Sequence, residues 1–366
     1  MAIMSSDGAP ASRLGVDANS ASNSNTGNEA LFLKVFSSEI LTAFEEHNCM
    51  KDLHTIRTIS SGKSAQFPVS GVAEAVRHVP GQSLVEKAST YLSDIGHTER
   101  TISIDDMLVS SAFVANVDEM RNHYDVRSIY SAEIGKALAK AFDIQAMKTL
   151  YAAAKSAASI SGQTSGGTVI SSTDSGGLDS VAEIIDSLYT VAQTLDEKDA
   201  PSDGRFAIVT PGTYYKLFTA DHLAINKDFA NAGNADAAKG TILDVAGIRL
   251  YKSNHLKSVA DLGDKSGVTS GSDIDGVKNN VFDDSGFGGS DGGDGYMGNF
   301  ANLTDGTNYG ILAGTKDAIG TVKLLDLATE SEYQIERQGT LFVSKFMLGT
   351  GVLRPECAVA VEVDAA

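Results

Sequence analysis

The clearest element in the sequence is the stretch of residues 117–158, which has no proline and a single glycine, Gly135. Its apolar residues recur mainly at steps of three and four, which is the spacing of one helix face. They are Met120, Tyr124, Tyr130, Ile134, Leu138, Ala141 and Phe142. As one helix the stretch would be roughly 60 Å long, at about 1.5 Å per residue. It therefore predicts either the core helix of a large domain or a spine that spans an extended subunit.

The N-terminal residues 5–26 are rich in Ser, Ala, Asn and Gly and have almost no large apolar side chains. Such a segment cannot offset its own ordering entropy by burial, so we expect a flexible or partner-ordered arm. Asn28 then offers a helix N-cap, and apolar residues follow at helical spacing. They are Leu31, Phe32, Val35, Phe36, Ile40 and Phe44. Residues 1–50 thus predict an arm with one short amphipathic helix, whose apolar face must pack on this subunit or on a neighbour.

The pattern changes over residues 56–104, where glycine and proline punctuate short stretches and residues 98–104 alternate as in a strand. We expect a long two-stranded excursion, and such a hairpin is marginally stable in water unless it lies on something else. The string from Ser61 to Ser64 contains the end of a phosphate-binding loop, but Arg57 occupies the position of the first glycine of that motif. A turn of the hairpin is the better interpretation.

A Gly- and Ser-rich link at residues 159–177 precedes a second domain. There we expect a helix over residues 181–195, a strand at 206–210, a helix that opens at Pro211 and a strand at 247–252. The alternation of helices and strands predicts a compact α/β unit.

The pattern of residues in the C-terminal part of the chain predicts β-strands. Tyr333, Ile335 and Arg337 alternate, and residues 358–363 form a continuous apolar run apart from Glu362. We interpret the run as a buried strand. A terminal strand that returns to pair with earlier segments would make the helix-bearing domain discontinuous in sequence.

Residues 261–305 are rich in Gly, Ser and Asp and contain nine Asp and two Lys, so 2 − 9 = −7 of the net charge lies there. We expect a surface loop. A weak cation site in this loop is the alternative, because hard cations prefer carboxylate and carbonyl oxygens. Residues 293–298 match G-x-G-x-x-G, but in a region so rich in glycine the match is close to chance.

The overall composition restricts the classes of function. The chain has 29 Lys and Arg against 47 Asp and Glu, a formal net charge of −18, which opposes close contact with a polyanionic backbone. Cys49 and Cys357 lack a Cys or His at metal-ligand spacing, which indicates a reducing compartment. No apolar run approaches the roughly 18 residues that span a bilayer. No nucleophile, base and orienting group can be assembled from the pattern. We therefore expect no enzyme activity, no cofactor, no bound metal and no membrane insertion.

Six strings, in order along almost the whole chain, resemble the major capsid proteins of short-tailed phages of the T-seven-like kind (podoviruses). They are ALFLKVF at 30–36, EILTAF at 39–44, SGKSAQFPV at 61–69, NHYDVRS at 122–128, GTVKLLDLA at 320–328 and LRPE at 353–356. The resemblance is weakest in the first 27 residues and at residues 159–308. The acidic loop departs from the family pattern and suggests a surface position or a saline habitat such as that of marine phages.

This resemblance implies an α+β fold, the tailed-phage and herpesvirus capsid fold, with an N-terminal arm, an E-loop hairpin, a P domain with a long spine helix, and an A domain. The implied segments are the arm at 1–50, the E-loop and flanking strands at 51–104, the P domain at 105–176 and 329–366 with its spine helix at about 117–158, and the A domain at 177–328 with its acidic loop at 261–305.

The resemblance also implies a function. Copies should form hexamers and pentamers of an icosahedral shell, assembled with a scaffolding protein and a portal protein in the cytoplasm of the host bacterium. The virion shell would enclose double-stranded DNA without sequence-specific binding. Another phage structural protein, such as a tail-tube or decoration subunit, and a soluble enzyme with an unrecognised site are the alternatives.

The string 122–128 lies near the start of the expected long helix, where Tyr124 can join the apolar face while Asp125 and Arg127 point outward. Its expected role is structural. The residues singled out as assembly or structural motifs are Phe32, Phe36, Lys63, Arg77, Asn122, His123, Tyr124, Asp125, Arg127, Lys323, Arg354, Pro355 and Glu356.

Overall fold

The computed structural model describes residues 39–44, 47–73, 75–85, 95–104, 107–115, 126–162, 164–172, 180–219, 235–236, 241–242, 244–256 and 308–363. The chain divides into two units. Unit 1 comprises Met1–Asn48, Met107–Ala141 and Leu325–Met347. Unit 2 comprises Cys49–Asp106, Phe142–Leu324 and Leu348–Ala366. Neither unit coincides with one of the segments expected from the sequence, so the assignment to arm, E-loop, P domain and A domain stays a prediction.

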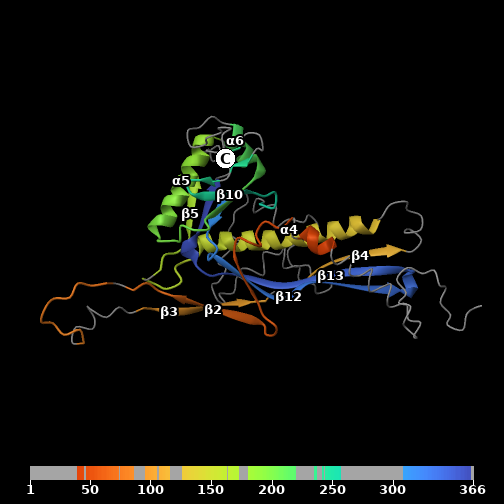
Figure 1. Cartoon of the computed structure of the whole chain (residues 1–366), viewed down its shortest axis with the longest axis horizontal. Coiled ribbons are helices and arrows are strands. Elements are labelled where there is room, and N and C mark those ends of the chain that lie inside the picture. The colour runs from red at the N-terminus through yellow and green to blue at the C-terminus, as the bar shows by residue number, and fades with distance from the viewer. Residues whose placement is uncertain are drawn as a thin grey trace, which may run out of the picture. The chain divides into compact units, whose positions relative to one another are not determined.

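Three long elements contribute residues to both units: the helix α4 (Val126–Lys155) and the strands β12 (Ile319–Gln334) and β13 (Gly339–Val352). At 30 residues α4 is about 45 Å long. It lies within the stretch expected to be helical, whose first residues, 117–125, lie outside the described residues. The short helix η3 (Ile335–Arg337) connects β12 to β13 (Figure 1).

In unit 1, the strand β4 (Leu108–Ala115) pairs antiparallel with β13, from Gly339 opposite Ala115 to Phe346 opposite Leu108. Apolar and small residues fill β4, which suits a strand that packs one face and leaves the other open. Val109 and Phe113 are exposed on its open face.

The helical residues 39–44 pack on the first half of α4. Ile40 and Phe44 are buried, and the Phe44 ring meets Phe346 edge-on at 5.7 Å between centroids. The two helices approach most closely at Gly135, where an added Cβ would lie 2.7 Å from the carbonyl oxygen of Ile40. The single glycine of α4 therefore admits the N-terminal helix. The apolar face of that helix packs, in its described part, on its own subunit.

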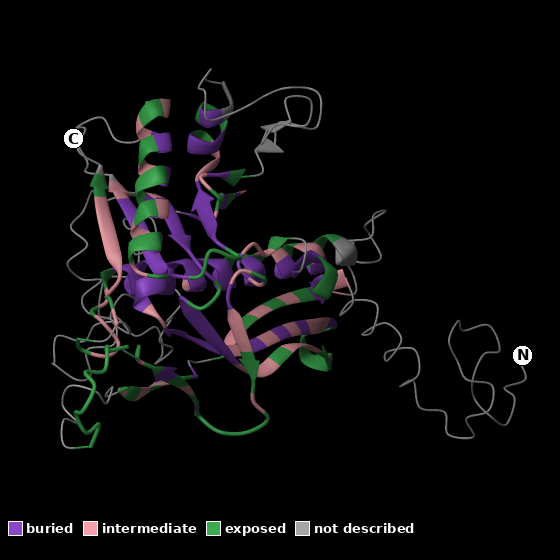
Figure 2. Cartoon of the chain, turned by 60° about the vertical axis from the view of Figure 1, so that its left-hand side comes forward, coloured by how far each residue is buried: buried purple, intermediate pink, exposed green. Residues whose placement is uncertain are grey.

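Unit 2 is built on a six-stranded sheet with the order β5-β14-β11-β6-β10-β9. Its strands are buried in the centre, as the purple arrows of Figure 2 show. Their bounds are β5 (Thr168–Ser172), β14 (Ala358–Val363), β11 (Asn308–Gly314), β6 (Phe206–Val209), β10 (Ile248–Lys252) and β9 (Asp244–Val245).

The helix α5 (Val181–Glu197) packs an apolar stripe onto this sheet, because Ile184, Leu188 and Val191 recur at steps of three and four and are fully buried. The N-cap of α5 is Ser180, which forms a capping box with Glu183. The helix α6 (Pro211–Thr219) opens on a proline, as the sequence predicts.

Unit 2 also contains several short strands and the hairpin. The strand β1 (Thr55–Thr58) pairs in parallel with the start of β12, at residues 320–323. The strands β2 (Ser64–Ser70) and β3 (His97–Ser103) form the expected two-stranded excursion. The minor elements are β7 (Ala235–Asp236), β8 (Thr241–Ile242) and η4 (Pro355–Cys357).

Two local expectations from the sequence are wrong. The link at 159–177 contains the strand β5, whose residues Thr168–Ser172 pair in parallel with β14 although the segment around them is rich in Gly and Ser. The alternation of Tyr333, Ile335 and Arg337 does not continue as strand, because residues 335–337 form η3 and Gln338 adopts a left-handed conformation with φ of 51°. Among the described residues, no helix is long and apolar enough to span a bilayer.

Candidate assembly site

The hairpin of β2 and β3 runs antiparallel from Ser64 opposite Ser103 to Ser70 opposite His97. Ala65, Val69 and Ile102 are its buried residues and the other positions are largely exposed. Two strands with so few buried side chains are marginally stable by themselves. The hairpin therefore depends on what holds its inner end and on what covers its outer end.

At the inner end, Ile102 and the following residues lie against glycines of β12 and β13. An added Cβ on Gly351 would lie 2.7 Å from Cγ1 of Ile102, and on Gly349 it would lie 2.9 Å from Cα of Ile104 and inside the contact distance of the Ser103 carbonyl oxygen. Only glycine admits a backbone at this distance. The inner end of the hairpin thus packs directly against these glycines.

Hydrogen bonds reinforce this inner end. The amide of Ile104 donates to the carbonyl of Lys63 at 2.9 Å, and the Arg57 guanidinium donates to the carbonyl of Gln66 at 2.9 Å. Arg100 Nη2 donates to Ser159 Oγ at 3.2 Å. The hairpin is thus fixed at its base by backbone contacts and by side-chain hydrogen bonds.

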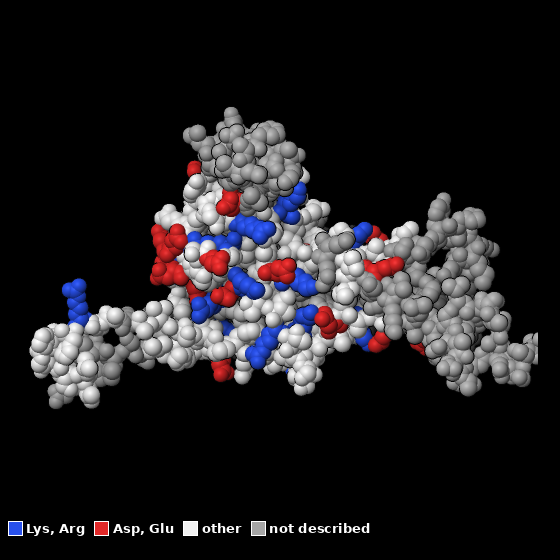
Figure 3. Space-filling view, in the orientation of Figure 1, with Lys and Arg blue, Asp and Glu red and all other residues white. Residues whose placement is uncertain are grey.

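The outer hairpin, which we define as residues 71–85, is largely exposed, in contrast to the base of the hairpin. Its large apolar side chains are exposed, with Val85 81 % and Val72 66 % accessible, and Glu74 and Arg77 are its only charged residues. Figure 1 shows this part as an extended orange trace beyond β2 and β3, and Figure 3 draws it mainly white. The exposed apolar residues are Val72, Val76, Val79, Leu84 and Val85. Several exposed apolar side chains within one segment are typical of an interaction site.

Unit 1 carries a second group of exposed apolar side chains. Ile335 is 73 % and Ile129 56 % accessible, and the group also includes an N-terminal helix residue and two on β4. The members of this group are Leu41, Val109, Phe113, Ile129, Tyr130, Tyr333 and Ile335. Val109 and Phe113 lie on the open face of β4, whereas Ile129 and Tyr130 lie on α4 and Tyr333 and Ile335 lie where β12 meets η3.

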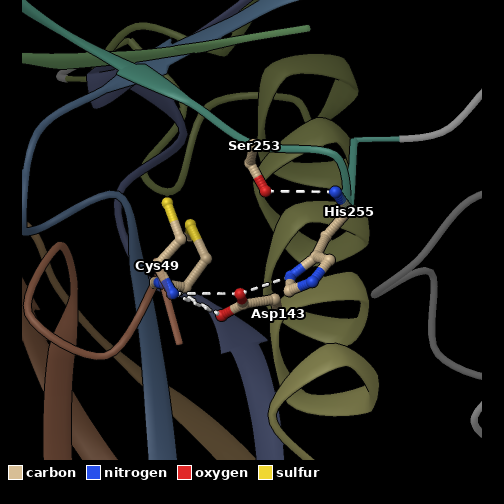
Figure 4. Close-up of polar contacts among 5 residues, drawn as sticks. Cys49, Asp143, Ser253 and His255 are labelled. Carbon is tan, nitrogen blue, oxygen red and sulfur yellow. Dashed lines mark hydrogen bonds and ion pairs between the residues drawn. The ribbon is translucent and has the colours of Figure 1, made fainter. Parts of the chain in front are cut away.

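A buried carboxylate, Asp143, lies in the second half of α4 and connects three chain segments (Figure 4). It accepts the amide N–H of Cys49 at 3.0 Å, the amide N–H of Met50 at 3.0 Å and a bond from His255 Nδ1 at 2.7 Å. Ser253 Oγ in turn accepts the amide of His255 at 3.1 Å. The carboxylate thus joins α4 to the chain before β1 and to the chain after β10.

Next to this node, His54 is 2 % accessible and uses both ring nitrogens. Nδ1 bonds the carbonyl of Met50 at 2.6 Å and Nε2 bonds Thr321 Oγ1 at 2.7 Å. Burial lowers the pKa of His54 to about 4, against the opposing effect of the Met50 carbonyl. Burial, assisted by the charge of Asp143, raises the pKa of the Cys49 thiol to about 12. The thiol is therefore an unreactive packing group at neutral pH.

The described contacts of Asp143 and His54 hold chain segments together. Cys49 and Cys357 are free thiols. Within the described ranges, no group of three or more His, Cys, Asp or Glu side chains is placed to hold a metal ion. Asp143 is fully occupied by donors, and its partners are backbone amides and one imidazole.

Several of the residues singled out from the sequence lie outside the described residues, namely Phe32, Phe36, Asn122, His123, Tyr124 and Asp125. Arg127 lies in the first turn of α4. The structure places Lys63 and Lys323 near the base of the hairpin, where the Lys323 carbonyl accepts the amide of Ile59 at 2.9 Å. Arg77 is exposed in the outer hairpin.

The remaining predicted residues form the turn before β14. The Arg354 amide donates to the carbonyl of Ala318 at 3.2 Å, Pro355 begins η4, and Glu356 is buried. The described residues of this set therefore lie in four separate places, and the role of each residue in assembly stays a prediction. The residues that sequence reasoning missed are Asp143, His54 and His255. The one available signal was a charged residue, Asp143, on an otherwise apolar run of α4.

Comparisons with known proteins agree on one family. Residues 66–362 match the family model Gp10A-like, described as major capsid protein. The chain is 33 % identical over 341 residues to the major capsid protein of Escherichia phage T7, covering 91 % of each chain, and 31 % identical over 355 residues to that of Enterobacteria phage T3, again covering 91 % of each.

Solved structures give the same result. The chain is similar to the capsid structure of the cyanophage P-SCSP1u, with 36 % identity, a TM-score of 0.66 and coverage of 97 % of this chain and 98 % of that one. The mature capsid of bacteriophage PhiM1, at 15 % identity and a TM-score of 0.60, shares the fold and covers 86 % and 87 %. The chain therefore belongs to the Gp10A-like family of major capsid proteins, and it is a structural protein of a bacteriophage shell with the tailed-phage capsid fold and not an enzyme.

Proposed function

We propose that copies of this chain assemble as hexamers and pentamers into an icosahedral shell around double-stranded phage DNA, and that the outer hairpin lies on a neighbouring copy. The observation that carries this proposal is the exposed apolar surface of residues 71–85 at the end of a hairpin whose base is fixed. Burying Val72, Val76 and Val85 would contribute about 1.5 kcal/mol or more per side chain. That stability belongs to the shell and is absent from the isolated subunit.

The same proposal assigns the segments of the chain. Residues 1–50 act as the arm, 51–104 as the E-loop, 105–176 and 329–366 as the P domain, and 177–328 as the A domain. The net charge of −18 supports a wall that encloses DNA without gripping it. Assembly would proceed in the cytoplasm of the host bacterium with a scaffolding protein and a portal protein as partners.

Electron microscopy of the chain co-expressed with its scaffolding protein tests the assembly proposal directly. Closed shells with hexamers and pentamers are the expected product. Open tubes or stable monomers would contradict it.

The outer hairpin has its own test. Val76→Asp and Val85→Asp each place a charge in the surface proposed to be buried between copies, so we expect shell yield to fall at least tenfold. Both positions are exposed in the subunit, so the free energy of unfolding should change by less than about 0.5 kcal/mol. Sedimentation of co-expressed material measures the yield, and denaturant unfolding measures the subunit.

The matched control is Ala182→Asp, which adds the same charge at an exposed position of α5. It should assemble normally. If both hairpin variants also formed shells at the normal yield, the outer hairpin would not be a contact between copies.

The arm can be tested by removing residues 1–38. The helical residues 39–44 and their packing on α4 then remain, so we expect a folded subunit with an unchanged unfolding midpoint and few normal shells. A longer deletion through residue 50 also removes the amides that Asp143 binds and should destabilise the subunit itself. Normal shells from the shorter deletion would show that residues 1–38 are dispensable for assembly.

A further inference from the structure

Residues 49–54 connect the N-terminal helix to β1, and hydrogen bonds hold them at both ends. At one end, Asp143 of α4 accepts the amides of Cys49 and Met50. At the other end, His54 bonds Thr321 at the start of β12. The Met50 carbonyl lies between them and accepts both the Leu53 amide at 3.1 Å and the His54 ring. One continuous polar network therefore fixes this segment inside the core of unit 2.

The network requires a particular form of His54. Because a carbonyl can only accept, Nδ1 of His54 carries the hydrogen that is donated to Met50. In the neutral ring Nε2 then accepts from the Thr321 hydroxyl. Protonation would turn Nε2 into a donor and place a charge in a site that is 2 % accessible and bordered by the Phe142 ring at 5.7 Å.

The charged groups around His54 oppose one another. Asp143 on α4 and Asp52 in the segment itself favour the charged ring, whereas Lys316, in the turn before β12, disfavours it. His255 faces the same Asp143 carboxylate from the other side. Asp143 and Asp52 offset only part of the cost of burying the charged ring, so the effect of burial prevails and the pKa of His54 is lowered.

We propose that His54 makes residues 49–54 an acid-sensitive latch, in which protonation of the buried imidazole releases this segment from α4 and β12. The chain that leaves the latch forms β1 and then the hairpin. Acid therefore loosens the inner end of the first hairpin strand before it unfolds the six-stranded sheet. The inference does not depend on where the outer hairpin binds.

The size of the effect follows from linkage. The pKa of His54 is lowered from 6.5 to about 4 in the closed latch and returns to its ordinary value when the latch opens. The open form then binds more protons between these two values, so opening becomes easier as the pH falls through this window. Between about pH 7.5 and about pH 5 the opening equilibrium should rise about 30-fold.

Amide hydrogen exchange of the full-length capsid protein tests the latch. The reporters are the amides of Cys49, Met50 and Leu53, with exchange rates corrected for the intrinsic effect of pH. In the wild type their opening equilibrium should rise about 30-fold from about pH 7.5 to about pH 5. Amides of β11, such as those of Ile311 and Leu312, should change by less than threefold. These core amides separate local release from global unfolding.

Two variants remove the titrating group and keep polar atoms in its place. In His54→Gln and His54→Asn the rise at the three reporter amides should fall below threefold, whatever the stability of each variant at neutral pH. The Gln and Asn side chains differ in length, so the test still works if one of the two variants does not fold. A wild-type rise below threefold, or a full rise that persists in both variants, would overturn the latch.

Discussion

Replacing Asp143 by alanine should lower the free energy of unfolding of the subunit by roughly 3 to 5 kcal/mol. The carboxylate is fully buried, and its removal leaves the amides of Cys49 and Met50 and the ring of His255 without an acceptor. Unpaired buried donors lose their full desolvation energy, which is more than the net value of the hydrogen bonds they made. Denaturant unfolding followed by circular dichroism measures the change.

The matched control for this substitution is Asp186→Ala, an exposed aspartate of α5. It should change the free energy of unfolding by less than about 0.5 kcal/mol. A loss below about 1 kcal/mol in Asp143→Ala would mean that the three segments are held together by packing alone. Such a result would also weaken the polar network on which the acid-sensitive latch depends.

Replacing Gly349 by alanine should cost about 3 kcal/mol, at the upper end of what overpacking does in protein cores. The new Cβ would collide with the carbonyl oxygen of Ser103 and lie 2.9 Å from Cα of Ile104, and both are backbone atoms that cannot rotate away. Relief requires the base of the hairpin to move off β13. We therefore expect lower stability together with reduced shell yield, measured by thermal unfolding and by sedimentation.

Gly212→Ala provides a control of opposite sign. Gly212 lies in α6, and its added Cβ would meet no atom closer than 4.0 Å, so the helix should gain up to about 1 kcal/mol. An unchanged unfolding midpoint in Gly349→Ala would show that the contact between these glycines and the hairpin relaxes easily. The base of the hairpin would then not be firmly fixed.

Local patterns in the sequence predicted much of the secondary structure. The stripe of α5, the proline that opens α6 and the alternation before Ser103 each depend on residues a few positions apart, and all three elements are confirmed. The fold was predicted from the six strings that resemble the capsid family, because local patterns do not indicate how these elements are arranged in space.

The contacts that organise unit 2 were not predictable in this way. Asp143 and Cys49 are 94 positions apart, and Asp143 and His255 are 112 positions apart. The residues next to each of them in the sequence therefore do not indicate which distant residue it will contact. Glu362 was the exception in an apolar strand. It bonds the Tyr151 hydroxyl and pairs with Lys155 at 2.8 Å, again from a distant helix. The strand β5 was missed because its pairing partner lies near the other end of the chain.

The position of β14 has a consequence for the synthesis of the protein. This strand lies between β11 and β5, inside the six-stranded sheet, and it follows every other strand of that sheet in sequence. Until β14 has been translated, β5 has no neighbour to pair with in this sheet and is separated from the other four strands. A chain that has not been translated through residue 363 therefore has an incomplete sheet, in which one edge of β11 is unpaired. The core of unit 2 is thus completed only when its last described strand has been made.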